Sequence, residues 1–399
     1  MAERRKPLVT VAILSYKNLE YIHDCLNSIL EQNYNPIQLI VSDDNTCEFN
    51  QKAIKDYIAQ HNRGNVQEVF IHTMEKNVGT SKNFNFALAH SKGKYIKFIA
   101  ADDLLYDVDS LSHLVSVAES ESSMVVIARA ANYDRYLERQ EWIYPSDEHW
   151  AMMKGAASNP KEFFGIMSQF CLISAPSTLY NREFLIREGG ANEKYRLIED
   201  WPLWMKMLRT GKNFTFLNEC TAIYRSGGVS NGAANPSYAV HQIEYADVIR
   251  DECLKYPDAM ATQEQYALAK KSEQLHRFEG ERLLNKEAPL TKRLVLVLHY
   301  WNIYAKKAIK KLNESFWRVE KYKRNMLVGS ILLLTVSLLT DSVSLLSFDS
   351  MTGVGANIGV VLREAGVIGG WLGGAVAIFL YILSMPYKLY CTLHYSQRK

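Results

Sequence analysis

Hydrophobic and polar positions follow two alternating periods along the first 110 residues. Val9–Ser15 is a short apolar run that predicts a buried strand, and apolar residues then recur at helical spacing from Leu19 to Ile29. The same pair of patterns predicts further strands at Ile37–Ser42, Val66–Thr73 and Tyr95–Ala100, and helices at Gln51–His61 and Thr80–Ser91. Such strand–helix alternation predicts an α/β fold with a mostly parallel sheet covered by helices.

The pattern is less regular after this region. Strands are expected at Met124–Ala130 and Asn213–Tyr224, and residues 236–325 are expected to be mainly helical. Between Lys292 and Arg324, ten Lys and Arg residues stand against two acids and alternate with Leu and aromatic residues. A basic amphipathic stretch of this kind is typical of a membrane interface. A helix packed on the protein's own surface would show the same pattern.

Two long apolar segments follow, at Met326–Phe348 and Gly366–Met385. The second is uncharged over about the 20 residues that a bilayer requires, and the first contains one acid, Asp341, towards its distal end. Basic residues flank the pair, whereas Arg363 is the only basic residue between them. The positive-inside rule then predicts a transmembrane hairpin with both chain ends in the cytoplasm. We therefore expect residues 326–390 to form two membrane helices, with a short cytoplasmic tail at 391–399.

Composition narrows the compartment and the class of protein. The N-terminal apolar run is too short for a signal peptide, and the six scattered cysteines form no C-x-x-C pair, which favours free thiols in a reducing compartment. These features predict that the first 300 residues lie on the cytoplasmic face of the inner membrane. A net charge of +3 gives no indication of nucleic-acid binding. No phosphate-binding P-loop, dinucleotide fingerprint, H-E-x-x-H or G-x-S-x-G motif is present.

Acidic pairs follow two predicted strands and precede one predicted helix. They are Asp43-Asp44, Asp102-Asp103 and Glu199-Asp200. In parallel α/β sheets, ligands bind at the carboxyl ends of the strands, and paired carboxylates suit Mg²⁺ or Mn²⁺. Ordinary structural roles would also explain these pairs: turn formation by Asp43-Asp44, a loop start or helix cap at Asp102-Asp103, and an N-cap at Asp200 before Trp201-Pro202.

Four sequence blocks resemble the family-2 glycosyltransferases, which have a GT-A fold. In order they are VTVAILSYKN with LIVSDDNT, NVGTSKNFNFALAHSKGKYIKFIAADD, GGANEKYRLIEDWPLWMKMLRTG, and YRSGG. The resemblance spans roughly residues 8–232. It implies a nucleotide-diphospho-sugar transferase domain of Rossmann-like type over residues 1–235, followed by the helical juxtamembrane region 236–325 and the membrane hairpin.

The resemblance also implies roles for the matching residues. Asp102 and Asp103 would engage the metal, Mg²⁺ or Mn²⁺, and the donor diphosphate. Asp200 would be the catalytic base of an inverting displacement, with Glu199 and Trp201 beside it on the acceptor side. The other expected donor contacts are Ser15, Asp43 and Asp44 for the base and ribose, and Arg225 for the diphosphate. Lys82 is a further candidate for a donor contact.

This chain departs from the family's pattern at three points. Ala100 stands where the metal motif usually begins with an acid, so metal binding would rest on Asp102 or Asp103. The central block reads Asn83-Phe84-Asn85, where many members have Ala-Arg-Asn, which leaves Lys82 to replace the missing Arg. The closing loop, residues 224–228, has no His that could reach a metal.

The resemblance and the membrane pattern together predict transfer of a sugar from a nucleotide-sugar donor to a hydroxyl of a lipid-linked glycan, in capsule or O-antigen biosynthesis. Two other hypotheses remain: a polyprenyl-phosphate glycosyltransferase, and a catalytically silent membrane scaffold. The polyprenyl-phosphate enzymes usually carry Asp-Leu-Gln after the metal acids, whereas this chain has Asp103-Leu104-Leu105. Paired glycines at Gly369-Gly370 and Gly373-Gly374 could support helix association and hence a homo-oligomer.

Overall fold

The computed structural model describes residues 6–17, 19–227, 236–301, 303 and 304. The chain divides into two compact units, Met1–Leu296 and Val297–Lys399, and nearly all described residues belong to the first. Among the described residues, no helix combines the length and the apolar character needed to cross a membrane. The two predicted membrane helices, in residues 326–390, lie outside the described residues, as does most of the basic stretch before them.

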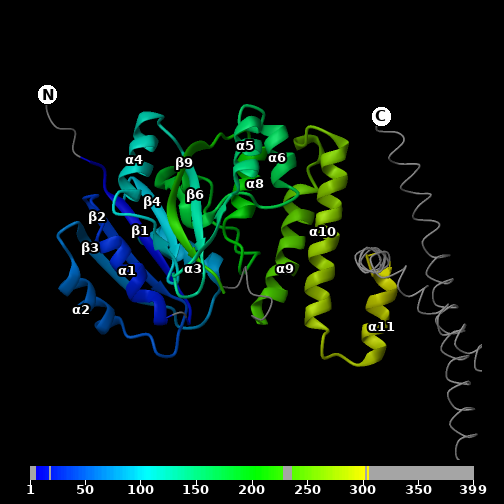
Figure 1. The fold of residues 1–399 in the computed structure, drawn as a ribbon, viewed down its shortest axis with the longest axis horizontal. Helices are drawn as coiled ribbons and strands as arrows, with labels where there is room; N and C mark the ends of the chain where they lie inside the picture. Colours follow the sequence, from blue (N-terminus) through cyan, green and yellow to red (C-terminus); the bar gives the residue numbers. More distant parts are fainter. Residues whose placement is uncertain (1–5, 18, 228–235, 302, 305–399) are drawn as a thin grey trace, which may run out of the picture. The chain divides into compact units, whose positions relative to one another are not determined.

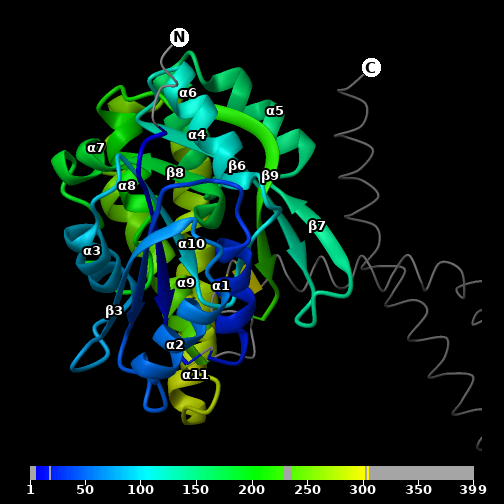
Figure 2. The ribbon, with the colours of Figure 1, turned by 90° about the vertical axis from the view of Figure 1, so that its left-hand side faces the viewer.

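The first unit is built on a mixed sheet with the strand order β3-β2-β1-β4-β8-β6-β9-β5, and β7 pairs with β6 (Figures 1 and 2). Strands β1 to β4 are parallel to one another, as the sequence predicts, whereas β8 is antiparallel to both β4 and β6. The strands are β1 (Val9–Ser15), β2 (Ile37–Asp43), β3 (Val66–Thr73), β4 (Tyr95–Ala100), β5 (Leu104–Leu105), β6 (Val125–Tyr133), β7 (Gln140–Tyr144), β8 (Thr178–Asn181) and β9 (Thr215–Arg225).

Helices cover both faces of this sheet, because alternate side chains of β1 enter two different hydrophobic cores. Val9, Val11 and Ile13 pack with α1, α2 and α4, whereas Ala12 lies in the core shared with α3, α6 and α8. The helices are α1 (Ile22–Leu30), α2 (Gln51–His61), α3 (Thr80–His90), α4 (Ser110–Ser120), α5 (Asp147–Ala156), α6 (Pro160–Met167), α7 (Arg182–Arg187), α8 (Trp201–Arg209), α9 (Pro236–Val248), α10 (Gln263–Leu284) and α11 (Leu290–His299).

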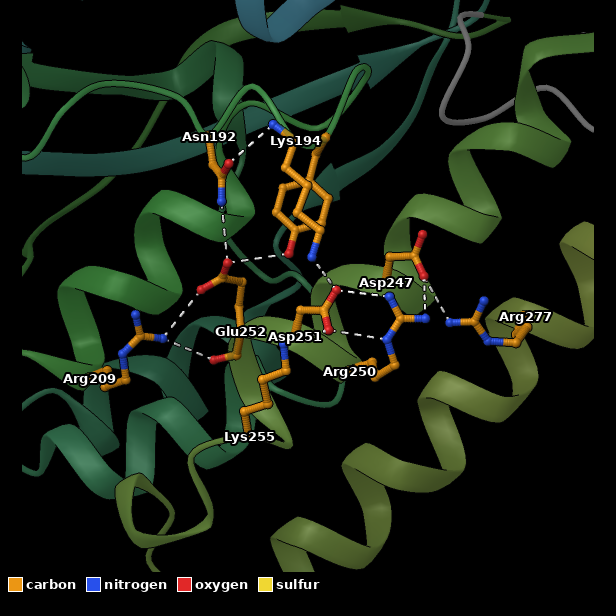
Figure 3. A network of polar contacts seen from close by, with 10 residues as sticks. Asn192, Lys194, Arg209, Asp247, Arg250, Asp251, Glu252, Lys255 and Arg277 are labelled. Atoms are coloured by element: carbon orange, nitrogen blue, oxygen red, sulfur yellow. Dashed lines mark hydrogen bonds and ion pairs between the residues drawn. The ribbon is translucent and has the colours of Figure 1, made fainter.

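Helices α9 and α10 run side by side and join the same unit (Figure 1). Their close approach depends on Gly280, where a Cβ atom would lie 2.7 Å from the Ile243 side chain and 2.8 Å from the Ala239 carbonyl oxygen. Asp247 of α9 pairs with Arg277 of α10 at 3.0 Å (Figure 3). Val248 is fully buried in the core that contains α8. These contacts fix α9 beside the carboxyl-end loops of the sheet.

Candidate active site

A cavity of about 510 Å³ opens where β1, β2 and β4 end. Its walls also include the turn before α3, the 3-10 turn Ala175–Ser177, and residues 196–200 of the segment before α8. Helix α9 also contributes to the lining. The cavity therefore lies at the carboxyl ends of the parallel strands, where ligands bind in open α/β sheets. The lining includes Ser15, Asp44, Asp102, Asp103, Glu199 and Asp200, all of which were predicted site residues.

Asp102 and Asp103 sit in a tight turn between β4 and β5. The Asp103 amide donates to the Ala100 carbonyl at 3.1 Å, and β5 then pairs with β9. The Asp103 carboxylate is 3% exposed and accepts the backbone N–H of Arg225 at 3.1 Å. Burial, and secondly the neighbouring Asp102, raise the pKa of Asp103 well above its ordinary value. Two adjacent carboxyl groups, each lining the cavity, supply hard oxygen ligands that fit a divalent cation.

Within the described residues, no group of three or more His, Cys, Asp and Glu side chains is arranged to hold a metal ion. A cation at Asp102 and Asp103 would therefore take its other ligands from water or from a bound phosphate group, as Mg²⁺ commonly does.

Arg225 was expected to contact the donor diphosphate, but the structure places it outside the cavity lining. Its guanidinium is 4% exposed and pairs with the Asp24 carboxylate at 2.8 Å. It also donates to the Asp102 carbonyl oxygen at 2.9 Å and lies 4.2 Å from the centre of the Tyr21 ring. Arg225 therefore stabilises the backbone of the Asp102-Asp103 turn from its buried side.

The neighbouring residues Asp43 and Asp44 have different surroundings. Asp43 accepts both the backbone N–H and the hydroxyl of Thr46, each at 2.7 Å, and does not line the cavity. This is the turn-forming role that the sequence analysis gave as an alternative. Asp44 does line the cavity, and its carboxylate accepts backbone N–H groups of Val78 at 2.6 Å and Gly79 at 2.8 Å. It thereby fixes the turn that leads into α3.

Ser15 ends β1 at the floor of the cavity. Its hydroxyl is buried and has no hydrogen-bond partner among the described residues. Buried polar groups are nearly always paired, so an unpaired hydroxyl in a cavity wall indicates a position where a ligand completes the hydrogen bonding.

Glu199 and Asp200 line the cavity from the segment that leads into α8. Asp200 caps α8, since its carboxylate accepts the Trp201 backbone N–H at 2.5 Å, and it also lines the cavity. Burial raises the pKa of Asp200 to about 6; burial and the adjacent Asp200 raise that of Glu199 to about 8. A carboxylate whose pKa approaches neutrality is suited to accept a proton from a substrate hydroxyl. The capping and catalytic interpretations of Asp200 are therefore compatible.

Two other predicted residues lie away from the cavity. Trp201 is 1% exposed, and its indole N–H donates to the Met167 carbonyl at 3.0 Å within the core. Lys82 is on the exposed side of α3, outside the cavity lining. Asn83 of the same helix lines the cavity instead and donates to the Ser42 carbonyl oxygen at 3.0 Å.

The structure also adds residues that the sequence analysis did not select. Arg196 and Asn77 line the cavity near Asp44, and His241 and Tyr245 line it from α9. Burial lowers the pKa of His241 to about 4, so its ring is neutral at physiological pH. Arg196 and Asn77 lie inside blocks that carry the family resemblance, which is a signal that could have found them. The residues of α9 lie beyond all four blocks and carry no such signal.

Comparison with known proteins shows what part of this chain is similar to. Residues 10–185 match the family model described as glycosyl transferase family 2. The uncharacterized glycosyltransferase EpsJ of Bacillus subtilis is 24% identical over 66% of this chain and 72% of its own length. UDP-Glc:alpha-D-GlcNAc-diphosphoundecaprenol beta-1,3-glucosyltransferase WfaP of Escherichia coli is 26% identical over 56% of this chain and 80% of its own.

Among solved structures, S. aureus TarS 1-349 in complex with UDP is 15% identical, with a TM-score of 0.45, over 71% of this chain and 76% of that one. The family model covers β1 to β4 and the Asp102-Asp103 turn. Residues 10–185 of this chain, which form a mixed α/β sheet with its helices, are therefore similar to the family-2 glycosyltransferases.

Proposed function

We propose that this protein is an inverting glycosyltransferase that moves a sugar from a nucleotide-sugar donor to a hydroxyl of a lipid-linked glycan, in the assembly of a bacterial cell-surface polysaccharide such as capsule or O-antigen. One observation carries the proposal. A single cavity joins Asp102 and Asp103, which fit a divalent cation, with Asp200, whose raised pKa fits a general base.

The reaction would be one displacement. Asp200 accepts the proton of the acceptor hydroxyl while that oxygen attacks the anomeric carbon of the sugar. The bond from this carbon to the diphosphate oxygen breaks, and the nucleoside diphosphate leaves with the electron pair. Mg²⁺ or Mn²⁺ held by Asp102 and Asp103 would supply positive charge near the leaving group. Attack opposite to the leaving group inverts the configuration at the anomeric carbon.

The lipid-linked acceptor is supported by two features. The name of WfaP specifies a diphosphoundecaprenol-linked sugar as the acceptor of that relative. Helix α11 of this chain leaves Leu290, Leu294 and Leu298 at 67%, 52% and 73% exposure, one turn apart, with Lys292 and Arg293 nearby. Exposed apolar side chains next to basic ones favour a membrane interface. With the predicted membrane hairpin in residues 326–390, they support a site on the cytoplasmic face of the inner membrane.

The test is hydrolysis of a panel of nucleotide-sugars by the full chain purified in detergent, with Mn²⁺ or EDTA. We expect slow release of nucleoside diphosphate from one donor, which EDTA and the Asp103→Asn substitution both abolish. The matched control is Asp56→Asn, because Asp56 is exposed on α2 and pairs only with Lys52 in the described contacts. Absence of both hydrolysis and nucleotide binding across the panel would refute the catalytic proposal and favour a scaffold.

A further inference from the structure

The cavity lining is rich in carboxyl groups, whereas the donor that we propose is an anion. Its lining contains five carboxyl groups, of Asp44, Asp102, Asp103, Glu199 and Asp200. Among the described lining residues, the only Lys and Arg side chains are Lys17 and Arg196. A nucleoside diphosphate is itself an anion, so its binding requires cationic or N–H donor groups on the cavity wall. Any such group on the protein is therefore important for affinity.

Arg196 is placed to provide this interaction. Its Nη2 atom donates to the Asn77 carbonyl oxygen at 3.2 Å and also to the Asn77 side-chain oxygen. The Asn77 amide in turn donates to the Asp44 carboxylate at 2.9 Å. No described residue accepts a hydrogen bond from Nε or Nη1 of Arg196, so these donors remain for a ligand. The guanidinium thus lies beside the turn that follows β3, on the same wall as Asp44.

The backbone that carries Arg196 is held from two sides. Glu244 of α9 accepts the backbone N–H groups of Arg196 at 2.9 Å and Leu197 at 2.7 Å. On the other side, the Ser81 amide donates to the Arg196 carbonyl oxygen at 3.3 Å. Gly79 permits this approach, because a Cβ atom there would lie 2.4 Å from Cγ of Arg196. A side chain on a fixed backbone loses less conformational entropy when a ligand binds.

We propose that Arg196 binds the nucleoside diphosphate part of the donor, and that Asn77 and Glu244 position it there. This inference rests on the proposed function and extends it to a residue beyond the family-matched segment 10–185. A guanidinium can donate in parallel to two oxygens of a phosphate, a geometry that an ammonium group does not reproduce. Arg196→Lys should therefore restore only part of the affinity lost in Arg196→Gln.

The matched control is Lys194, a cation two residues away in the same segment. It turns towards Asp251, with which it pairs, and it does not line the cavity (Figure 3). Lys194→Gln therefore removes one positive charge from the segment without changing the cavity wall. Because Arg196 and Lys194 are both exposed, each substitution should lower the urea midpoint of unfolding only slightly, and Lys194→Gln does so through the lost pair with Asp251.

The experiment is isothermal titration of the full-length variants with UDP and with GDP, in the presence of Mn²⁺. For the nucleotide that the wild type binds, we expect Arg196→Gln to raise Kd about 10- to 100-fold, the effect of losing hydrogen bonds to a charged group. Lys194→Gln should stay within about twofold. Glu244→Gln should weaken binding less than Arg196→Gln, since it loosens the backbone and leaves the guanidinium present.

Unchanged affinity in Arg196→Gln, with a wild type that binds, would overturn the inference and leave the proposed function standing. An equal loss in Lys194→Gln would also overturn it, because the effect would then be general electrostatics. A wild type that binds neither nucleotide and hydrolyses no donor would overturn both proposals. In steady-state hydrolysis, Arg196→Gln should raise KM for the donor with a much smaller effect on kcat, which a merely structural role would not produce.

Discussion

Glu199 lies beside Asp200 in the cavity wall, and this position makes its ionisation unfavourable in the folded protein. Burial, and secondly the Asp200 carboxylate, raise the pKa of Glu199 from 4.5 to about 8. The folded protein then holds a proton that the unfolded chain has already released over this pH range. Stability must therefore fall as pH rises from about 4.5 to about 8. Glu199→Gln removes the titrating group and should remove this part of the pH dependence.

The size of the effect follows from the two pKa values. At about 1.4 kcal/mol per pKa unit, ionising Glu199 costs the folded state roughly 4 kcal/mol by pH 8, and less than about 1 kcal/mol at pH 5. The pH-dependent difference is about 3 kcal/mol. We therefore expect Glu199→Gln to be more stable than the wild type at pH 8 by this order, and nearly equal to it at pH 5. The melting temperature at pH 8 should rise by about 6 °C.

The assay is thermal unfolding between pH 5 and pH 8.5 in EDTA, which keeps divalent cations from stabilising the acidic wall. Glu121→Gln is the matched control, because Glu121 is exposed at the end of α4 and outside the cavity. Its melting curve should follow the wild type at every pH. If Glu199→Gln and the wild type lose stability in parallel as pH rises, the pKa of Glu199 is not raised in the folded protein and this prediction is wrong.

Three other substitutions test separate parts of the site. Asp200→Asn should lower sugar transfer about 10²–10⁴-fold while nucleoside diphosphate affinity, measured by titration, changes little, because the amide cannot accept the proton; equal losses in both would contradict its assignment as the base. Asp44→Ala leaves the backbone N–H groups of Val78 and Gly79 without their acceptor and should lower the free energy of unfolding in urea by about 2–4 kcal/mol. A change below about 0.5 kcal/mol would contradict a role for Asp44 in fixing this turn. Gly79 and Gly64 both have φ near +90°, but a Cβ atom at Gly79 would clash with Arg196, whereas one at Gly64 would meet no other atom. Gly79→Ala should therefore unfold at a clearly lower urea concentration than Gly64→Ala, and similar midpoints would contradict this contact.

The site shows which residues the sequence could identify. The sequence could indicate two acidic pairs, Asp102-Asp103 and Glu199-Asp200, because they lie next to β4 and α8. The hydrophobic period of these elements is visible in the sequence, and the end of a strand or helix determines where the adjoining side chains lie. The sequence could not assign different roles to the adjacent residues Asp43 and Asp44. Asp43 binds Thr46, whereas Asp44 binds a turn more than 30 residues away. Such partners depend on the packed structure, and the local pattern does not contain them.

By itself, the sequence determined the parallel strands β1 to β4, the helices between them, and the strand edge where acidic side chains gather. These follow from periods of two to four residues, which are local properties of the chain. The tertiary structure decided that Arg225 turns into the protein to pair with Asp24, that Arg196 lines the cavity, and that α9 forms one of its walls. Each of these outcomes needs contacts between residues far apart in sequence, such as the bond from Arg225 to Asp103 across 122 positions. Only folding brings such residues together, and the composition and spacing of either segment do not contain that information.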